Sequence, residues 1–567
     1  MPIVDETTPL RKPHKRVQAR TLPLPPTPVW VLLGVLIAFW GLRAMRPERV
    51  STEPFSEGSA NHAASNASLA MTEAGGQPEQ RPEEQPNLSA QPTATSTTET
   101  EPPALEPITS VTQFTSPAPP ADAGVNSRPL LTANASAETV QPESYTVVPG
   151  DTMGNIAAHF DVPVEELMAI NGMADPNLIY VGQVLILPTV VELAAPYQRL
   201  LPDSELVLSP VYADFNARAF IAQKGGYLAS HREEVEGEEL SGPEIVELVS
   251  TRYSVGPRPL LAMLEYQSGW LTRRDPEERE YPLGLEDPLR SGLFFQLSWA
   301  ANRMNEGYYN KYTGRDLTLR FKDGTRALLD SNTNPGTAAI QNAFAANNDP
   351  EAWSNALAAD GFLATYVKLF GEPFARTIEP LIPADLEQPE LRLPWSSGET
   401  WYYTGGPHGG WGDLSGWAAL DFVPADNTGC ADSSFWATSA TRGRVIRSEN
   451  GEVVVDLDGD GFGGTGWTVL YMHMGSAGRV PVGTHVKVGD RIGRPSCEGG
   501  FSDAAHLHIA RRYNGQWIDA DGAVPFVLGG WQAQNGAGTY NGYLVRGSES
   551  REACVCRTDE INGIKAP

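Results

Sequence analysis

Two histidines that stand two residues apart, His506 and His508, are the clearest sign of chemistry in this sequence of 567 residues. They belong to the stretch HLHIARRY, whose composition is typical of a β-strand. Side chains two apart in a strand point to the same face, so both imidazoles are predicted to project into one space. Asp421, at the end of the strand-like stretch GWAALDF, is a reasonable carboxylate ligand beside them. A catalytic zinc takes three protein ligands and keeps a fourth position for water, so this pattern still lacks one ligand.

The elements that must position these side chains are short strands. From residue 401 onward, strand-like stretches alternate with Gly-rich turns, which predicts an antiparallel all-β domain. These stretches are GWAALDFVP, FWATSATRGRVIRS, GEVVVDLDGDG, GWTVLYMHM, THVKVGDRIGRPS and HLHIARRYNGQW. No HExxH pattern is present in the sequence to compete for the metal.

This C-terminal region, residues 396–557, resembles the lysostaphin and β-lytic (LytM-type) group of zinc metalloendopeptidases. In the lysostaphin branch a histidine ligand stands four residues before the aspartate, where this chain has Trp417. In the β-lytic branch that ligand lies in a Gly-Gly-x-His loop about a dozen residues upstream, and GGPHGGWG places His408 thirteen residues before Asp421. The resemblance therefore implies that His408, Asp421 and His508 bind Zn²⁺.

The same resemblance implies that His473, at the end of YMH, and His506 form the catalytic pair. Zinc lowers the pKa of its bound water towards about 7 and polarises the scissile carbonyl. One free histidine would take the proton of the water, and the pair would stabilise the developing oxyanion and protonate the leaving amine. We expect His485, in THVKVGD, to be a surface or hydrogen-bonded core residue with no part in the site.

A second pattern that could bind a metal is DLDGDG. Asp456, Asp458 and Asp460 precede Gly461 with the spacing of the first half of a calcium loop. The twelfth position is Trp467 instead of Glu, and the flanking segments are predicted strands and not helices. A hairpin turn is therefore the favoured interpretation, with calcium binding as the alternative.

Residues 144–188 read as a compact β-α-α-β unit. The opening YTVVPGDT, the asparagine Asn171 that ends the second helical stretch and the closing VGQVLILP resemble a LysM domain. That resemblance implies binding to N-acetylglucosamine-containing glycans such as peptidoglycan, through the loops after the first strand and before the last. The implied contacts are Gly150, Asp151, Thr152, Asn177, Leu178 and Ile179. A spacer role for the same fold is the alternative.

Residues 196–394 carry helical patterns, beginning with SGPEIVELV and its expected cap at Ser241. Their order resembles the lysozyme-like domain of lytic transglycosylases, in which a Glu-Ser pair carries the catalytic acid. Here Gln267 stands before Ser268, and an amide has no proton to donate to a leaving oxygen. Glu265, two residues earlier, faces another side of the helix, and we expect it to be an ordinary helix residue. The domain is expected to be a degenerate one that binds glycan or positions its neighbours, with glycan cleavage through Glu265 as the alternative.

The N-terminal part is predicted to attach the chain to a membrane. Basic residues in segment 1–28 precede an apolar run in segment 29–45. The run is short for a spanning helix, so a cleaved signal peptide is the alternative to a signal anchor. The excess of basic residues upstream predicts a cytoplasmic N-terminus. Residues 46–143, rich in Pro, Ser, Thr, Ala and Glu, are predicted to be a disordered linker.

Composition excludes some functions and constrains the compartment. A net charge of −27 argues against nucleic-acid or anionic-lipid binding as the main role. The four cysteines, Cys430, Cys497, Cys554 and Cys556, permit disulfides in an exported protein, with three connectivities possible. Cys430 with Cys497 is the pairing that we expect first.

Together these patterns predict a multidomain envelope protein: a membrane anchor and disordered linker, a LysM domain, a mainly helical lysozyme-like domain and an all-β zinc metallopeptidase domain. The expected function is hydrolysis of peptide cross-links or bridges of peptidoglycan, with the LysM domain raising the local concentration of substrate. The protein would be single-pass in the cell membrane, or secreted if the N-terminal segment is cleaved. The rival hypothesis is a non-catalytic wall-binding adaptor that activates another hydrolase.

Overall fold

The computed structural model describes residues 144–160, 162–188, 190–191, 193, 199–316, 318–426 and 428–567. The predicted segments 1–28, 29–45 and 46–143 lie outside the described residues, so the signal anchor and the linker stay predictions. In the described ranges, no helix is long and apolar enough to cross a membrane.

Residues 144–188 form the predicted β-α-α-β unit. Strand β1 (Ser144–Thr146) pairs antiparallel with β2 (Val184–Ile186), and the helices α2 (Met153–His159) and α3 (Val164–Ile170) lie between them in sequence. Asn171 ends α3, and its side-chain amide bonds the backbone of Ile186, which ties the helix to the last strand.

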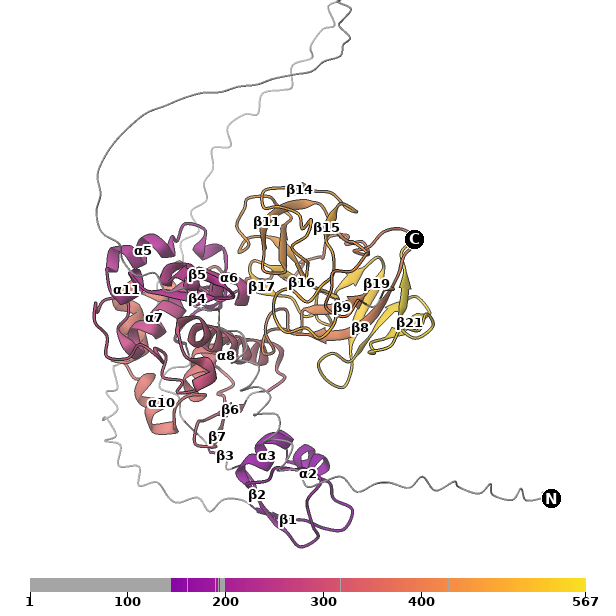
Figure 1. Cartoon of the computed structure of the whole chain (residues 1–567). Coiled ribbons are helices and arrows are strands. Elements are labelled where there is room, and N and C mark those ends of the chain that lie inside the picture. The colour runs from indigo at the N-terminus through magenta and orange to yellow at the C-terminus, as the bar shows by residue number, and fades with distance from the viewer. Residues whose placement is uncertain are drawn as a thin grey trace, which may run out of the picture. The chain divides into compact units, whose positions relative to one another are not determined.

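The middle region is mainly helical (Figure 1). Its principal helices are α5 (Ala217–Lys224), α6 (Gly242–Tyr253), α7 (Pro257–Ser268), α8 (Leu293–Thr313), α9 (Pro335–Ala345), α10 (Pro350–Ala356) and α11 (Phe362–Phe370), with short α4 (Asp203–Leu206). Two small hairpins lie between helices in the sequence. Strands β4 (Arg232–Val235) and β5 (Glu238–Ser241) stand between α5 and α6, and β6 (Thr318–Arg320) and β7 (Arg326–Leu328) stand between α8 and α9. Strand β3 (Val190–Val191) pairs with β7. Ser241 caps α6 as predicted, through a capping box with Glu244.

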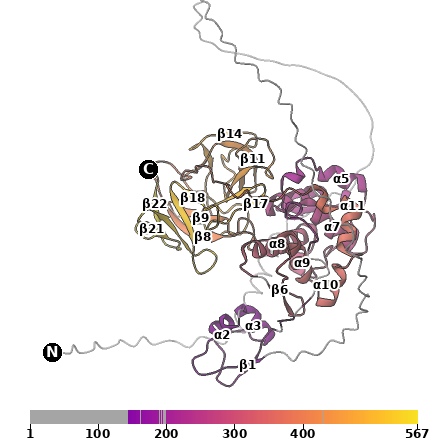
Figure 2. The same ribbon diagram turned by 180° about the vertical axis from the view of Figure 1, so that it is seen from behind.

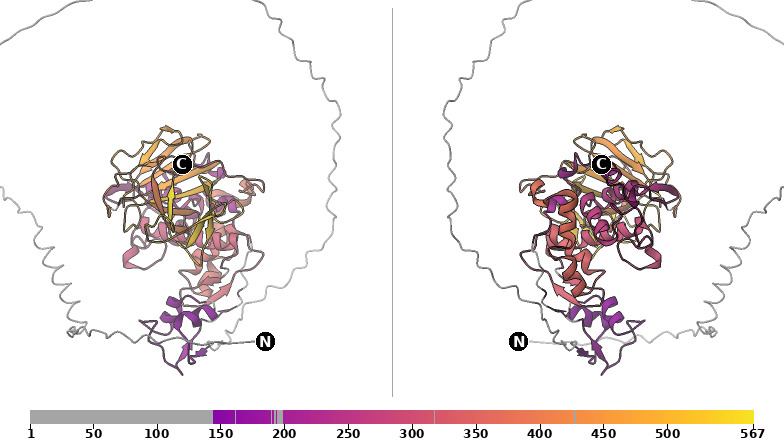
Figure 3. Two further views of the ribbon diagram at one scale, coloured as in Figure 1. Left: turned by 90° about the vertical axis from the view of Figure 1, so that its right-hand side faces the viewer. Right: turned by 90° about the vertical axis from the view of Figure 1, so that its left-hand side faces the viewer.

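The C-terminal region is antiparallel and sheet-rich, as predicted (Figures 2 and 3). Its large sheet has the strand order β14-β11-β12-β13-β16-β9-β8-β22, with β17 paired to β16. The bounds are β8 (Thr400–His408), β9 (Ala419–Val423), β11 (Gly443–Glu449), β12 (Glu452–Asp456), β13 (Trp467–Met472), β14 (His485–Val486), β16 (Leu507–Tyr513), β17 (Gln516–Trp517) and β22 (Gly563–Lys565). A second sheet contains β18 (Val527–Leu528), β19 (Trp531–Asn535), β20 (Gly542–Arg546) and β21 (Glu549–Glu552), and β10 (Ala437–Thr438) pairs with β15 (Arg491–Gly493).

The helical region and the large sheet share one buried core. Leu470 of β13 and Trp517 of β17 belong to the same apolar cluster as the buried side chains of α6 and α8. Tyr308 and Tyr309 of α8 bond Gln516 and the backbone of Trp517, so polar contacts accompany the apolar ones.

The cysteines form two disulfides. Cys430 is bonded to Cys497, which confirms the expected pairing, and Cys554 is bonded to Cys556. The first bond links the loop between β9 and β10 to the loop between β15 and β16, and so holds the segment that precedes β16.

Candidate metal centre

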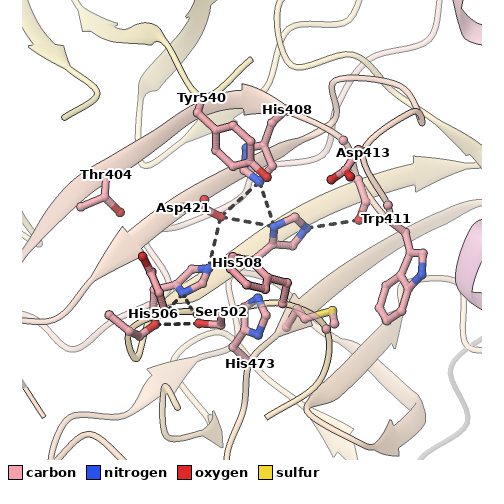
Figure 4. A pocket seen from close by; sticks show the side chains of 18 of the residues that line it. Thr404, His408, Trp411, Asp413, Asp421, His473, Ser502, His506, His508 and Tyr540 are labelled. Carbon is pink, nitrogen blue, oxygen red and sulfur yellow. Dashed lines mark hydrogen bonds and ion pairs between the residues drawn. The ribbon is translucent and has the colours of Figure 1, made fainter. Parts of the chain in front are cut away.

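Neighbouring strands of the large sheet bring His408, Asp421 and His508 together (Figure 4). His508 on β16 is the direct register partner of Asp421 on β9, and His408 ends the adjacent strand β8. Register shifts on β8 before His408 turn its side chain towards Asp421. Gly405 leaves room for the carboxylate, because a Cβ there would lie 2.3 Å from Asp421 Oδ2.

Backbone carbonyls orient both imidazoles of this cluster. His408 Nδ1–H donates to Gly406 O at 2.7 Å, and His508 Nε2–H donates to Gly410 O at 3.2 Å. The remaining nitrogens, His408 Nε2 and His508 Nδ1, then carry lone pairs and face each other at 3.0 Å. Two lone pairs at that separation repel unless a cation lies between them, and such carbonyl contacts are typical of histidines that bind metals.

The three donor atoms have the spacing of a zinc site. His408 Nε2 and His508 Nδ1 lie 3.3 and 3.2 Å from Asp421 Oδ1. Ligands about 2.0–2.1 Å from a tetrahedral zinc are about 3.3 Å apart. Asp421 Oδ1 is buried and accepts no hydrogen bond from the described residues. Two imidazoles and a carboxylate thus fit zinc in both chemistry and geometry.

His473 and His506 lie beside this cluster (Figure 4). Their ring centroids are 4.3 Å apart, and His506 Nε2 is 3.8 Å from Asp421 Oδ1. The Nδ1–H groups donate to backbone carbonyls, that of His473 to Glu498 O and that of His506 to Ala504 O. Each ring therefore keeps its Nε2 for a water or a substrate. His473 has a φ of 63°, a conformation uncommon for a residue with a side chain.

Burial and neighbouring charges set the ionisation of the cluster. Burial raises the pKa of Asp421, but His408, His506 and His508 outweigh it and hold this pKa well below its usual range. Burial, followed by repulsion from His506 and His508, lowers the pKa of His473 to about 3. His473 is thus a neutral imidazole at neutral pH, with a lone pair on Nε2.

A cavity of about 870 Å³ opens over the cluster. It is lined by all five predicted residues and by side chains that sequence reasoning missed, among them Trp411, Asp413, Phe501 and Tyr540. Tyr540 stacks on His408 with ring centroids 4.2 Å apart, and burial followed by the Asp421 charge raises its pKa to about 12. No spacing rule links Tyr540 to the histidines, so only the fold places it there.

His485 is exposed on β14 and takes no part in the centre, as expected.

The six residues predicted to bind glycan lie in the two expected loops of the 144–188 unit. Leu178 is 71% exposed, whereas Asp151 accepts hydrogen bonds from Tyr145 Oη and the backbone of Val148. Thr152 accepts a hydrogen bond from the backbone of Asn155 in the first turn of α2. Asp151 and Thr152 therefore shape the loop, and Leu178 is free to make contacts.

In the helical region, Gln267 is exposed on α7. The Glu265 carboxylate accepts hydrogen bonds from the backbone of Leu271 and from both the backbone and hydroxyl of Thr272. It thereby anchors the loop after α7.

Family models match three parts of the chain. Residues 145–188 match the LysM domain, residues 199–384 match "LasA, N-terminal domain", and residues 433–520 match peptidase family M23. The chain therefore contains a LysM domain, a LasA N-terminal domain and a domain of peptidase family M23. The resemblance of the helical region to lysozyme-like domains stays a prediction.

Protease LasA of Pseudomonas aeruginosa is a homologue, 25% identical over 297 residues, which are 49% of this chain and 68% of LasA. The N-acetylmuramoyl-L-alanine amidase XlyA of Bacillus subtilis is 41% identical over 70 residues, 12% of this chain and 24% of XlyA. Among solved structures, the deep-sea M23 metalloprotease pseudoalterin is similar, with 25% identity, a TM-score of 0.24, and coverage of 29% of this chain and 96% of pseudoalterin.

Proposed function

We propose that this protein is a zinc-dependent endopeptidase that hydrolyses peptide cross-links or bridges of peptidoglycan. The observation that carries the proposal is the triangle of His408 Nε2, Asp421 Oδ1 and His508 Nδ1, whose sides of 3.0–3.3 Å match tetrahedral zinc. Zinc bound there would supply Lewis-acid activation of water and of the scissile carbonyl.

The remaining residues supply proton transfer and positioning. We assign His506 and His473 to the proton transfers, because each presents a free Nε2 beside the cluster while a backbone carbonyl holds its Nδ1. Either can accept the proton of the attacking water and return it to the leaving amine. The apolar and aromatic walls of the cavity, including Trp411 and Phe501, would bind the peptide and limit access of bulk water.

We further propose that residues 144–188 hold the enzyme on glycan strands through Gly150, Asp151, Thr152, Asn177, Leu178 and Ile179. A tethered catalytic domain meets its substrate at a raised effective concentration without a new contact. Two disulfides support an oxidising, extracytoplasmic compartment. Anchoring by segment 29–45 belongs to the same proposal.

The test compares zinc content and release of new amino termini from purified peptidoglycan for the parent, His408→Ala and His485→Ala. We expect about one zinc per chain and cleavage in the parent and in His485→Ala, and loss of both properties in His408→Ala. Zinc retained without cleavage in the parent would favour the rival hypothesis, a wall-binding adaptor. Cleavage unaffected by His408→Ala would show that the site is elsewhere.

A further inference from the structure

The loop between β12 and β13, residues 457–466, contains most of the DLDGDG pattern, which the proposed peptidase activity does not use. Asp456, Asp458 and Asp460 each direct a carboxylate oxygen to one place, and these oxygens lie within 4.8 Å of one another. The pattern therefore folds into a cluster of oxygen donors and not simply into a tight hairpin turn.

Asp456 contributes to this cluster a buried carboxylate oxygen that has no hydrogen-bond donor among the described residues. It ends β12 with a side chain that is 0% exposed, and its Oδ2 accepts the backbone N–H of Gly461 at 2.9 Å. Its other oxygen, Oδ1, is buried and accepts no hydrogen bond from any residue in the described ranges. Buried carboxylate oxygens are normally paired, because burial removes the water that would otherwise solvate their charge.

The charges around the cluster do not provide that partner. Within the part of the chain that the structure describes, none of the three aspartates forms an ion pair with a basic side chain. The Arg444 guanidinium lies near Gly461. Among the described residues it forms no ion pair with any of the three aspartates.

We propose that Asp456, Asp458 and Asp460 form a calcium-binding site. Carboxylates at the first, third and fifth positions with glycine at the sixth are the arrangement that wraps a calcium ion, and Gly461 at that sixth position has a φ of 92°. The ligands are all oxygens, which suits Ca²⁺ and separates this site from the imidazole-rich zinc centre. Asp458 and Asp460 are exposed, so water can complete the coordination.

The position of the loop indicates what the ion would do. A Cβ on Gly464 would lie 2.5 Å from the Leu208 carbonyl, so the loop packs directly against the helical region. Asp460 also accepts hydrogen bonds from Phe462 N at 2.7 Å and Thr465 Oγ1 at 2.6 Å, which link the ligand segment to the rest of the loop. Calcium would therefore order the loop where it contacts the helical region. With Trp467 in place of the glutamate at the twelfth position, we expect an affinity in the range of extracellular calcium modules, with a Kd of about 10⁻⁴–10⁻³ M.

The experiment titrates CaCl₂ into the zinc-loaded protein by calorimetry and follows its thermal midpoint with and without calcium. We expect one calcium per chain, a raised midpoint, and no change in zinc content. Asp458→Asn and Asp460→Asn should each weaken calcium binding by about tenfold or more, because each removes a charged ligand. Asp490→Asn is the matched control: this turn aspartate of the same region accepts Lys487 N at 2.7 Å but belongs to no cluster.

Three outcomes would overturn the proposal. They are no calcium-dependent heat or midpoint shift in the parent, an unchanged affinity in Asp458→Asn and Asp460→Asn, and calcium binding that disappears in His408→Ala, which would place the ion at the zinc centre. Asp458 and Asp460 are exposed, so both variants are expected to fold. The proposal does not depend on peptidase activity, and failure of one leaves the other intact.

Discussion

Hydrogen bonds to four backbone carbonyls decide which nitrogen of each histidine faces the centre. His408, His508, His473 and His506 each present one nitrogen to a carbonyl and the other to the cavity. The donor distances separate the roles, because His408 and His508 lie within 3.3 Å of Asp421 Oδ1 and His506 lies at 3.8 Å. Ligands and proton-transfer groups therefore respond differently to substitution.

His473→Gln and His506→Gln are expected to keep zinc and to lose cleavage by about 10²–10⁴-fold, because each removes a general acid–base and neither removes a ligand. Zinc content by mass spectrometry and release of amino termini from peptidoglycan measure the two effects. His485→Gln on β14 is the control and should match the parent. Loss of zinc in His506→Gln would instead make His506 a ligand.

Gly405→Ala tests the space that the fold reserves for Asp421. A Cβ 2.3 Å from Asp421 Oδ2 must displace the carboxylate, so we expect zinc affinity to fall by about 10–100-fold. Competition with a chelator measures the affinity. Gly538→Ala is the control, since a Cβ there meets nothing closer than 4.0 Å, and an equal loss in both variants would contradict the argument.

At the scale of elements, the N-terminus of α6 is held by a reciprocal cap. Ser241 Oγ accepts Glu244 N at 3.4 Å, and Glu244 Oε2 accepts Ser241 N at 2.8 Å. The Ser241 hydroxyl also donates to Glu244 Oε2 at 2.6 Å. This bond, then the bond from Ser241 N and the Arg218 guanidinium, lowers the pKa of Glu244 to about 2. α6 packs against the large sheet through the shared core, so the cap supports more than one helix.

Ser241→Ala is expected to lower the free energy of unfolding by about 1 kcal/mol at neutral pH, measured by urea denaturation.

The pH dependence of stability tests the Glu244 side of the cap. The folded-state pKa of Glu244 is depressed, so the contribution of its carboxylate to stability is present above the ordinary pKa of 4.5 and is lost as pH falls towards 2. The difference in thermal midpoint between the parent and Glu244→Gln should therefore shrink over that range. Glu239→Gln, exposed on β5, should show no such change, and a constant Glu244→Gln difference would refute the assignment.

At the scale of the whole molecule, buried charges join the helical region to the sheet. Arg252 of α6 and Arg447 of β11 lie 3.3 and 3.1 Å from the Glu452 carboxylate, and Arg252 also pairs with Glu236. The side chains of Arg252 and Glu452 are only 3% and 2% exposed. The helical region and the peptidase sheet are therefore expected to unfold together.

Glu452→Leu should lower the free energy of unfolding by about 3–5 kcal/mol, because it removes the buried carboxylate that Arg252 and Arg447 share across the two regions. Urea denaturation followed by far-UV circular dichroism measures the loss and should show one transition for both regions. Glu549→Leu removes the exposed partner of Arg546 and should change stability by less than about 1 kcal/mol. Equal effects of the two variants would show that the contact between the regions is weak.

Local sequence patterns determined much of this protein. Strand periodicity and Gly-rich turns predicted the antiparallel C-terminal region, and the cap at Ser241 and the end of a helix at Asn171 followed from short-range hydrogen bonding. The resemblance carried by GGPHGGWG brought His408 into the predicted ligand set, and the structure places it beside Asp421 and His508. These features depend on residues that are close in sequence or on a motif that can be read directly.

Tertiary structure alone decided the remainder. The register that pairs His508 with Asp421, the shifts on β8 that turn His408 inward, and Tyr540 stacked on His408 all depend on contacts between distant segments. The same holds for the buried, unpartnered oxygen of Asp456, since the hairpin pattern does not reveal which oxygen is shielded from water. Register, burial and the meeting of side chains follow from how strands pair and pack, and local periodicity does not specify that pairing.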